Sequence, residues 1–171
     1  LANLLGARDW DYVVGAVHFL RDAPVDMRGE WDVWRSADAD KVWARYFETL
    51  GEAARTGMFD ILAHPDLVKV WGKGAPTPDG DLRRFYELAI EGIAESGVAV
   101  GVSTAGLRKP VGELYPALPF LELCLEAGCP VALSSDAHLP DQLGYEHERA
   151  VDWLAAAGVT ELGVFGGREG V

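Results

Sequence analysis

The chain has 171 residues, which favours one domain, and 49% of them are hydrophobic, which is typical of a globular protein rather than a disordered one. Fifteen Lys and Arg residues against 27 Asp and Glu residues give a formal net charge of −12 at pH 7, which argues against nucleic acid or an anionic membrane as a partner. A small anionic substrate remains compatible with this charge, because bound cations can reverse its sign locally.

The cysteines and the apolar runs bear on cellular location. Cys124 and Cys129 are too few for a disulfide framework. One lies in an expected apolar helix and the other at an expected strand start, so we expect buried thiols in a reducing cytoplasm. No apolar run approaches the roughly 18 residues of a membrane span, and residues 1–5 lack the basic leader of a signal peptide. We therefore expect a cytoplasmic protein without membrane contact.

The first predicted strand covers residues 12–17, a nearly continuous apolar run that suits a strand buried on both faces. It ends at His18. Residues 19–37 follow as a long loop that contains Trp31, Trp34 and Arg35. A loop of this length in a compact domain usually has a function.

The second unit repeats this order. Asp38 or Asp40 can cap a helix that runs to about residue 56. Residues 59–63 are the second predicted strand, which ends at His64. Pro65 terminates this strand, because proline has no N–H to donate to a sheet. Another long loop, over residues 67–78, follows.

The rest of the chain continues the alternation, with helices over residues 79–96, 116–127 and 141–157 and strands over residues 98–102, 129–133 and 161–165. The third strand ends at Ser103, and the fourth leads into Ser134-Ser135-Asp136-Ala137-His138.

This alternation predicts an α/β fold with parallel strands and right-handed crossovers. The long loops all follow strands, whereas the turns after helices are short and marked by Gly. That asymmetry is typical of a βα barrel, in which the chemistry lies on the loops at the C-terminal ends of the strands. We expect all 171 residues to belong to one such domain.

Polar residues stand at those strand ends: His18, His64, Ser103, Asp136 and His138. Carboxylate and imidazole are the usual ligands of hydrolytic metals. A lone buried histidine is more often a core residue, but equivalent positions in successive βα units favour a metal site with His18, His64, Asp136 and His138 as ligands. His147 lies in an acidic helix, and we expect it at the surface.

Other residues near these strand ends also have a chemical interpretation. A serine nucleophile at Ser134 or Ser135 is disfavoured, because no Gly-x-Ser-x-Gly elbow is present. Arg108 and Lys109, which follow a strand end, can bind a phosphate that the metals also hold, or be solvated loop charges. Trp31, Trp34 and Arg35 can cover a planar substrate through stacking and cation–π contact, or be ordinary loop packing.

Four segments together resemble the polymerase-and-histidinol-phosphatase (PHP) superfamily, and most closely its monofunctional histidinol-phosphate phosphatases. They are Asp-Tyr-Val-Val-Gly-Ala-Val-His18, Ala-His64-Pro-Asp, Ser103-Thr-Ala-Gly-Leu-Arg108 and Ser-Ser-Asp136-Ala-His138. The match covers nearly the whole chain in the right order.

The resemblance implies a distorted seven-stranded TIM-like barrel with up to three divalent ions, commonly zinc, iron or manganese. It implies hydrolysis of L-histidinol phosphate to L-histidinol and phosphate, late in histidine biosynthesis. His18, His64, Asp136 and His138 match metal ligands. Asp136 and His138 are also candidates to assist the leaving group. Ser103, Arg108 and Arg35 are candidates to bind the phosphate or the substrate.

The family also implies residues that this chain does not contain. A His-x-His motif, a further His or Asp and a bridging Glu precede the position of His18 in the family, and none is present here. We therefore expect the C-terminal two-thirds of one barrel domain, with about half of the metal site. The rest belongs to a longer enzyme or comes from another chain, and self-association is left open.

Two alternatives to this function follow. The first is another phosphoesterase of the same superfamily that acts on nucleotides or sugar phosphates. The second is an inactive, metal-poor fragment that binds a partner through its open sheet edge.

Overall fold

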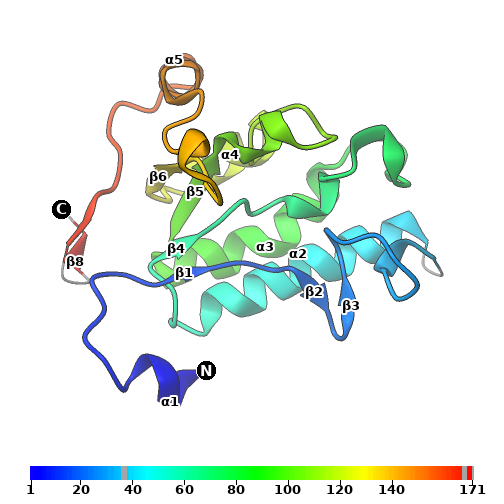
Figure 1. Ribbon diagram of the computed structural model, residues 1–171, viewed down its shortest axis with the longest axis horizontal. Coiled ribbons are helices and arrows are strands. Elements are labelled where there is room, and N and C mark those ends of the chain that lie inside the picture. Colours follow the sequence, from blue (N-terminus) through cyan, green and yellow to red (C-terminus); the bar gives the residue numbers. More distant parts are fainter. Residues whose placement is uncertain (36–37, 167–168, 171) are drawn as a thin grey trace.

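The computed structural model describes residues 1–35, 38–166 and 169–170, so the end of the predicted loop over residues 19–37 lies outside the described residues (Figure 1). Its centre is a four-stranded parallel sheet in the order β1-β4-β5-β6. These strands are β1 (Val14–Gly15), β4 (Ile61–Leu62), β5 (Ala99–Ser103) and β6 (Val131–Ser134). The predicted α/β fold with parallel strands is confirmed, and the described residues form four strands of a sheet rather than a closed barrel of seven.

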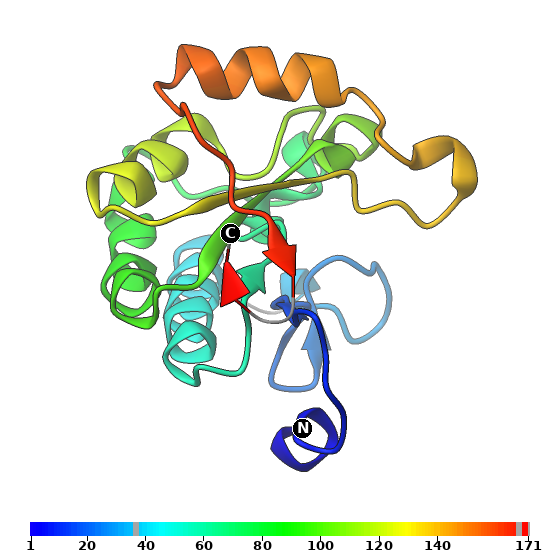
Figure 2. The same cartoon turned by 90° about the vertical axis from the view of Figure 1, so that its left-hand side faces the viewer.

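Each crossover between neighbouring strands of this sheet contains a helix. The helices are α2 (Ala39–Arg55), α3 (Arg83–Ser96), α4 (Leu118–Glu126) and, after β6, α5 (His147–Ala156). Helix α2 packs on α3, and α3 packs on α4. In Figure 2, as in Figure 1, α5 lies beyond β6 and far from α2 and α3.

Helix α2 begins and packs as its sequence predicts. The side chain of Asp38 accepts a hydrogen bond from the backbone N–H of Asp40, which caps the first turn. Glycines allow α2 and α3 to approach closely, since a Cβ on Gly92 would lie 2.6 Å from the carbonyl oxygen of Gly51. The apolar face of α2 is therefore fully buried against its neighbour.

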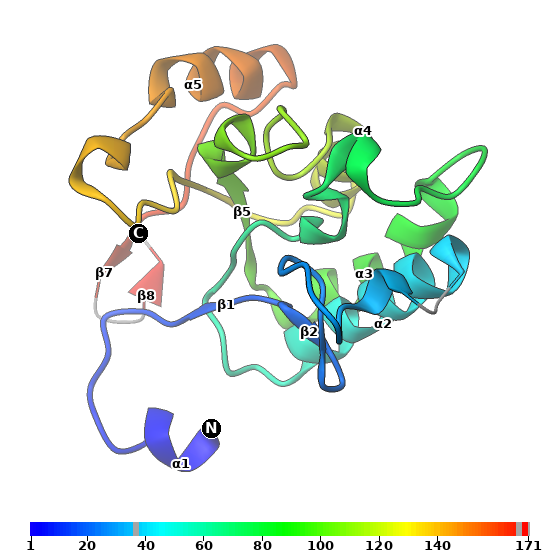
Figure 3. The same cartoon turned by 45° about the vertical axis from the view of Figure 1, so that its right-hand side comes forward.

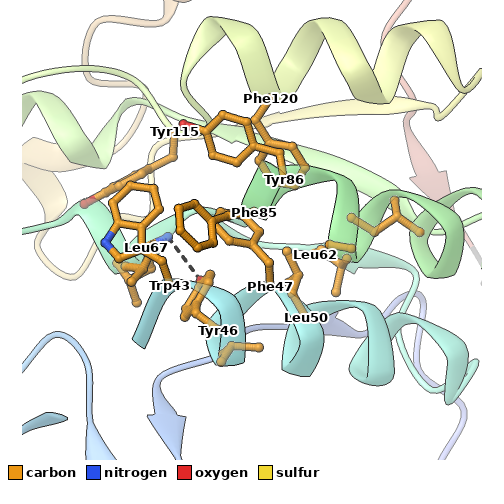
Figure 4. Packing of buried hydrophobic residues seen from close by; sticks show 14 of the residues in the cluster. Trp43, Tyr46, Phe47, Leu50, Leu62, Leu67, Phe85, Tyr86, Tyr115 and Phe120 are labelled. Carbon is orange, nitrogen blue, oxygen red and sulfur yellow. Dashed lines mark hydrogen bonds between the residues drawn. The ribbon is translucent and has the colours of Figure 1, made fainter. Parts of the chain in front are cut away.

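Aromatic side chains fill the space between α2, α3 and α4 (Figure 4). The ring of Phe47 lies edge-on to that of Phe120 at 5.2 Å between centroids, and Tyr86 stacks on Phe120 at 5.1 Å. The hydroxyl of Tyr46 accepts a hydrogen bond of 3.1 Å from the backbone N–H of Leu67. The core thus holds the loop that follows β4.

The loop after β1 folds back on itself. Strands β2 (Phe19–Leu20) and β3 (Ala23–Pro24) form an antiparallel hairpin, followed by the 3₁₀ helix η1 (Val33–Arg35). Figure 3 shows this hairpin beside α2, which β2 contacts. Further 3₁₀ helices η2 (Leu67–Lys69), η3 (Gly72–Gly74) and η4 (Thr104–Arg108) follow the next two strands. The described parts of the long loops therefore contain regular structure, and they follow the ends of the strands.

The C-terminal region departs from the prediction. The helix expected over residues 141–157 is interrupted, because η5 (Pro140–Gln142) precedes a turn in which Gly144 and Glu146 have φ values of 67° and 52°. The strand expected over residues 161–165 is wrong in extent. Its residues meet the sheet through one hydrogen bond of 2.7 Å, from the N–H of Gly163 to the carbonyl of Val131.

The remaining elements are short. Helix α1 (Ala2–Leu5) stands apart near the N-terminus, and β7 (Phe165–Gly166) pairs with β8 (Glu169–Gly170) in an antiparallel ribbon. The two cysteines are buried free thiols, as expected. Within the described residues, every helix is too short or too polar to cross a lipid bilayer.

Candidate metal centre

Side chains from the ends of three parallel strands line one cavity of about 210 Å³. His18 follows β1, His64 follows β4, and Asp136 and His138 follow β6. In a parallel sheet these C-terminal ends lie along the same edge, which brings residues distant in sequence together. The structure thus places all four ligands expected from the sequence in one pocket.

His64 is the most buried member of this set, with 4% of its surface exposed. Its ring lies edge-on to that of His18, at 5.1 Å between centroids. Burial lowers the pKa of His64, because the cation is poorly solvated there. The ring is therefore neutral near pH 7, and one of its nitrogens has a lone pair that can bind a metal ion. Its Nδ1 atom is buried without a hydrogen-bond partner among the described residues.

His18 has a carboxylate partner. Its Nδ1 atom lies 2.9 Å from Oδ2 of Asp26, which also lines the cavity. The hydrogen bond to Asp26 raises the pKa of His18, although partial burial opposes the shift. Because a carboxylate only accepts, Nδ1 carries the proton and the other ring nitrogen is left free.

Asp136 and His138 lie on a strained turn after β6. Asp136 has φ of 47°, a left-handed conformation that costs a side-chain-bearing residue about 1–3 kcal/mol. The Nδ1 atom of His138 donates to the carbonyl oxygen of Asp136 at 3.0 Å. His64 is also left-handed, with φ of 30°. Two of the four candidate ligands therefore occupy conformations that persist only where the surrounding structure enforces them, and such conformations cluster at functional sites.

Arg108 stabilises this turn through hydrogen bonds to its backbone. Its Nη2 atom donates to the carbonyl oxygens of Ser135 at 2.8 Å and Asp136 at 3.3 Å, and its guanidinium lies 5.1 Å from the ring centre of Tyr145. Its Nη1 atom is buried and lacks a partner in the described residues. The neighbouring Lys109 lines the cavity. The structure therefore places Lys109 in the pocket and Arg108 against the backbone of the turn.

The structure does not bring Ser103 or Arg35 into this cavity. Ser103 is fully buried, and its hydroxyl accepts the backbone N–H of Ala105 at 3.2 Å, which caps η4. Its backbone pairs in both directions with that of Tyr115, which does line the cavity. Arg35 instead lines a separate depression together with Trp31.

The donors suit a divalent metal only in part. Three imidazoles and two carboxylates are the ligand types of zinc, iron and manganese sites, and the unpaired Nδ1 of His64 is a buried polar atom that a metal ion would satisfy. However, no three His, Cys, Asp or Glu side chains of the described residues converge closely enough to hold one ion. The described residues thus offer donors of the right type without a complete ligand set for one ion.

Among the polar and aromatic residues that line this cavity, Asp26, Trp71 and Tyr115 were not expected as site residues, whereas Lys109 was expected, with Arg108, as a possible phosphate ligand. The pairing of Asp26 with His18 depends on the hairpin, which the sequence did not reveal. His147, expected at the surface, is partly buried beside β6 and lies outside the cavity.

Comparisons with known proteins bear on the family of this chain. No family model matches the sequence. The chain is 36% identical over 157 residues to a protein of Deinococcus radiodurans named probable histidinol-phosphatase. The chain is related to the histidinol-phosphatases. The resemblance inferred from its sequence is thereby confirmed. A protein of Schizosaccharomyces pombe with the same name is 27% identical over 162 residues.

These alignments cover 91% and 89% of the chain, but only 58% and 52% of the two histidinol-phosphatases. The chain therefore spans little more than half the length of the curated relatives it matches.

Solved structures support the fold. A histidinol phosphate phosphatase of Lactococcus lactis, complexed with zinc, L-histidinol and phosphate, matches 99% of the chain and 65% of its own with a TM-score of 0.79 and 17% identity. A putative histidinol phosphatase of Listeria monocytogenes matches 80% of the chain and 56% of its own, with a TM-score of 0.68 and 18% identity. At these identities the likeness establishes a shared α/β fold.

Proposed function

We propose that this chain carries part of the active site of a metal-dependent phosphomonoesterase that hydrolyses L-histidinol phosphate to L-histidinol and phosphate. The observation that carries the proposal is the meeting of His18, His64, Asp136 and His138 in one cavity at the ends of neighbouring parallel strands. The names of the related histidinol-phosphatases support it.

His18, His64, Asp136 and His138 are the residues that would hold the metals, with zinc, iron or manganese as candidates and up to three ions in a complete site. Bound divalent ions lower the pKa of water and offset charge on phosphoryl oxygens. The low pKa of His64 suits this role, because a neutral imidazole binds a metal without first losing a proton.

Cationic side chains of the chain would hold the phosphate. Lys109 lines the cavity and can neutralise a phosphoryl oxygen directly. Arg108 fixes the carbonyls of Ser135 and Asp136, and its buried Nη1 leaves one donor for an anion or water. Both would therefore act at the turn after β6.

The leaving alkoxide needs a proton, and Asp136 and His138 are the proposed catalytic side chains. His138 is the exposed imidazole of the set. Because its Nδ1–H is bonded to the carbonyl of Asp136, His138 can give a proton only from Nε2, and only while that atom is not bound to a metal.

The walls of the cavity suit a small substrate with a flat ring. Trp71 and Tyr115 are aromatic, and the cavity has a volume of about 210 Å³. An imidazole can stack on such a wall.

We also propose that residues 1–171 form one part of a single TIM-like barrel of seven strands, in a cytoplasmic protein. The consecutive order of the parallel strands and the match to 65% of the Lactococcus lactis structure support the barrel. The buried free thiols support a reducing compartment.

The first experiment is elemental analysis of the purified, folded chain, followed by measurement of phosphate release from L-histidinol phosphate. We expect bound zinc, iron or manganese and faster release than from a nucleoside monophosphate. A preference for the nucleotide would favour another phosphoesterase of the same kind. Absence of both metal and turnover would show that this chain alone is not the working enzyme.

The variant His64→Asn is the internal control, because it removes the most buried candidate ligand and Asn tolerates the left-handed φ of this position. It should lose bound metal and phosphate release together. Retention of both would contradict the proposed ligand set.

A further inference from the structure

We propose that Asp26 is the positioning residue that sets the tautomer of His18 and strengthens it as a metal ligand; this inference rests on the proposed metal-dependent function. The contact that carries it is the 2.9 Å hydrogen bond between Nδ1 of His18 and Oδ2 of Asp26. A carboxylate that accepts from one ring nitrogen leaves the other as the metal-binding atom and makes it more basic.

The chain brings the two residues together through its hairpin. The backbone N–H of Val25 donates to the carbonyl of His18 at 2.9 Å. The next residue, Asp26, therefore lies beside the imidazole of His18, which is eight positions earlier in the chain. The hairpin of β2 and β3 closes this return. Asp26 therefore reaches His18 by local folding, before any ligand is present.

Two tryptophans hold the backbone of this segment in place. The indole N–H groups of Trp34 and Trp71 both donate to the carbonyl oxygen of Val25, at 3.0 and 2.9 Å. Val25 is completely buried. A carboxylate carried by so constrained a backbone loses little entropy when it orients a ligand, which is the property expected of a pre-organised supporting residue.

His18 is the member of the set for which a side chain supplies this support. His138 donates its Nδ1 to a backbone carbonyl, and Nδ1 of His64 has no partner among the described residues. Removal of the carboxylate from Asp26 should therefore change His18 and leave the tautomer of His138 as it is.

The test compares Asp26→Ala, Asp26→Asn and Asp22→Ala with the unaltered chain. Zinc affinity is measured by competition with a chromophoric chelator. The ring nitrogens of the four histidines are observed by ¹⁵N NMR in the metal-free protein. Asp22 is the matched control, because it lies exposed in the same hairpin. Circular dichroism checks that each variant folds.

We expect Asp26→Ala to weaken zinc binding by about 10–100-fold, the usual range for loss of a supporting carboxylate. Asp26→Asn keeps a neutral acceptor and should recover part of the loss, and Asp22→Ala should bind as the unaltered chain does. In the spectra, His18 should carry its proton on Nδ1, and that preference should disappear in Asp26→Ala alone.

Two results would overturn the role of Asp26: unchanged zinc affinity in Asp26→Ala, or a His18 protonated on Nε2 in the unaltered chain. Failure of every protein, including the unaltered chain, to bind zinc is a different result. It would refute the proposed metal site itself, and the role of Asp26 with it.

Discussion

The ammonium group of Lys69 lies 2.9 Å from Oδ2 of Asp66, and both side chains are almost entirely removed from water. Lys69 also donates to the carbonyl of Leu114 at 2.8 Å and contacts Glu113 at 2.9 Å. Asp66 accepts the backbone N–H of Ala117 at 2.7 Å. This ion pair joins the segment after His64 to the segment that carries Tyr115, and both segments contribute residues to the lining of the cavity.

Loss of one partner of this pair should be costly. Lys69→Met leaves the carboxylate of Asp66 buried without a counter-charge, and we expect the free energy of unfolding to fall by about 3–5 kcal/mol. Urea denaturation measures this change. The double variant Asp66→Asn/Lys69→Met should recover part of the stability, because no buried charge remains.

Lys41→Met is the control for that variant, since Lys41 is exposed on α2. It should change stability by no more than about 0.5 kcal/mol. Equal stabilities for the two single variants would show that the buried pair contributes nothing.

The close approach at Gly106 gives a second prediction. A Cβ at this position would lie 2.0 Å from the carbonyl oxygen of Glu113, whereas one on Gly29 would meet nothing within 4 Å. Backbone must shift to admit the methyl group, so Gly106→Ala should destabilise the fold by about 1–3 kcal/mol. Gly29→Ala should be nearly neutral. Thermal unfolding of the two variants, each against the unaltered chain, distinguishes them.

The left-handed conformation of Asp136 gives a third prediction, on the balance of stability and function. Asp136→Gly relieves the strain but makes the unfolded chain more flexible, so the metal-free protein should gain up to about 1 kcal/mol or stay unchanged. Zinc binding should weaken sharply, because a candidate ligand is gone. Glu146→Gly, which relieves a φ of 52° outside the cavity, should leave zinc binding intact. A strongly destabilised Asp136→Gly would refute the argument from strain.

The pair of His18 and Asp26 predicts a dependence on pH. The pKa of His18 is raised above its ordinary 6.5, so the stabilisation it gives the metal-free protein is complete below pH 6.5 and is lost as pH rises through the raised value. His18 is 42% exposed, so solvent screening should keep the effect below about 1 kcal/mol.

Urea midpoints measured in the presence of a chelator between pH 6 and pH 8 check the sign. The contribution of the pair is the difference in midpoint between the unaltered chain and Asp26→Asn, and this difference should fall as pH rises. His64 acts in the opposite direction, because burial lowers its pKa and stability from this group grows as pH rises towards 6.5. A difference that rises with pH would contradict the assignment to His18.

The sequence could predict the elements whose signals are local. Asp38 caps α2 because its carboxylate accepts from the next turn, and this preference is visible in the residue types alone. His18, His64 and the Asp136 segment could be expected together because parallel strands place their C-terminal ends on one edge. Periodicity and strand-end position were sufficient for these inferences.

The features of the fold and the site that the sequence did not predict depend on contacts between residues that are not neighbours in the chain. The partnership of Asp26 and His18 needs the hairpin, and the burial of Ser103 needs its pairing with Tyr115. The late start of α5 follows from the left-handed turn at Glu146, a residue whose type does not require that conformation. Such features arise from tertiary structure, which a single sequence reports only weakly.

The shared carbonyl of Val25 has an optical consequence. Trp71 lines the cavity and donates to the same oxygen as the buried Trp34, so one indole is next to any bound ion and its neighbour is shielded from it. The emission of Trp71 should respond to occupancy of the site, while that of Trp34 responds to unfolding. Two of the six tryptophans of the chain are thus placed to report separately on ligand binding and on the integrity of the fold.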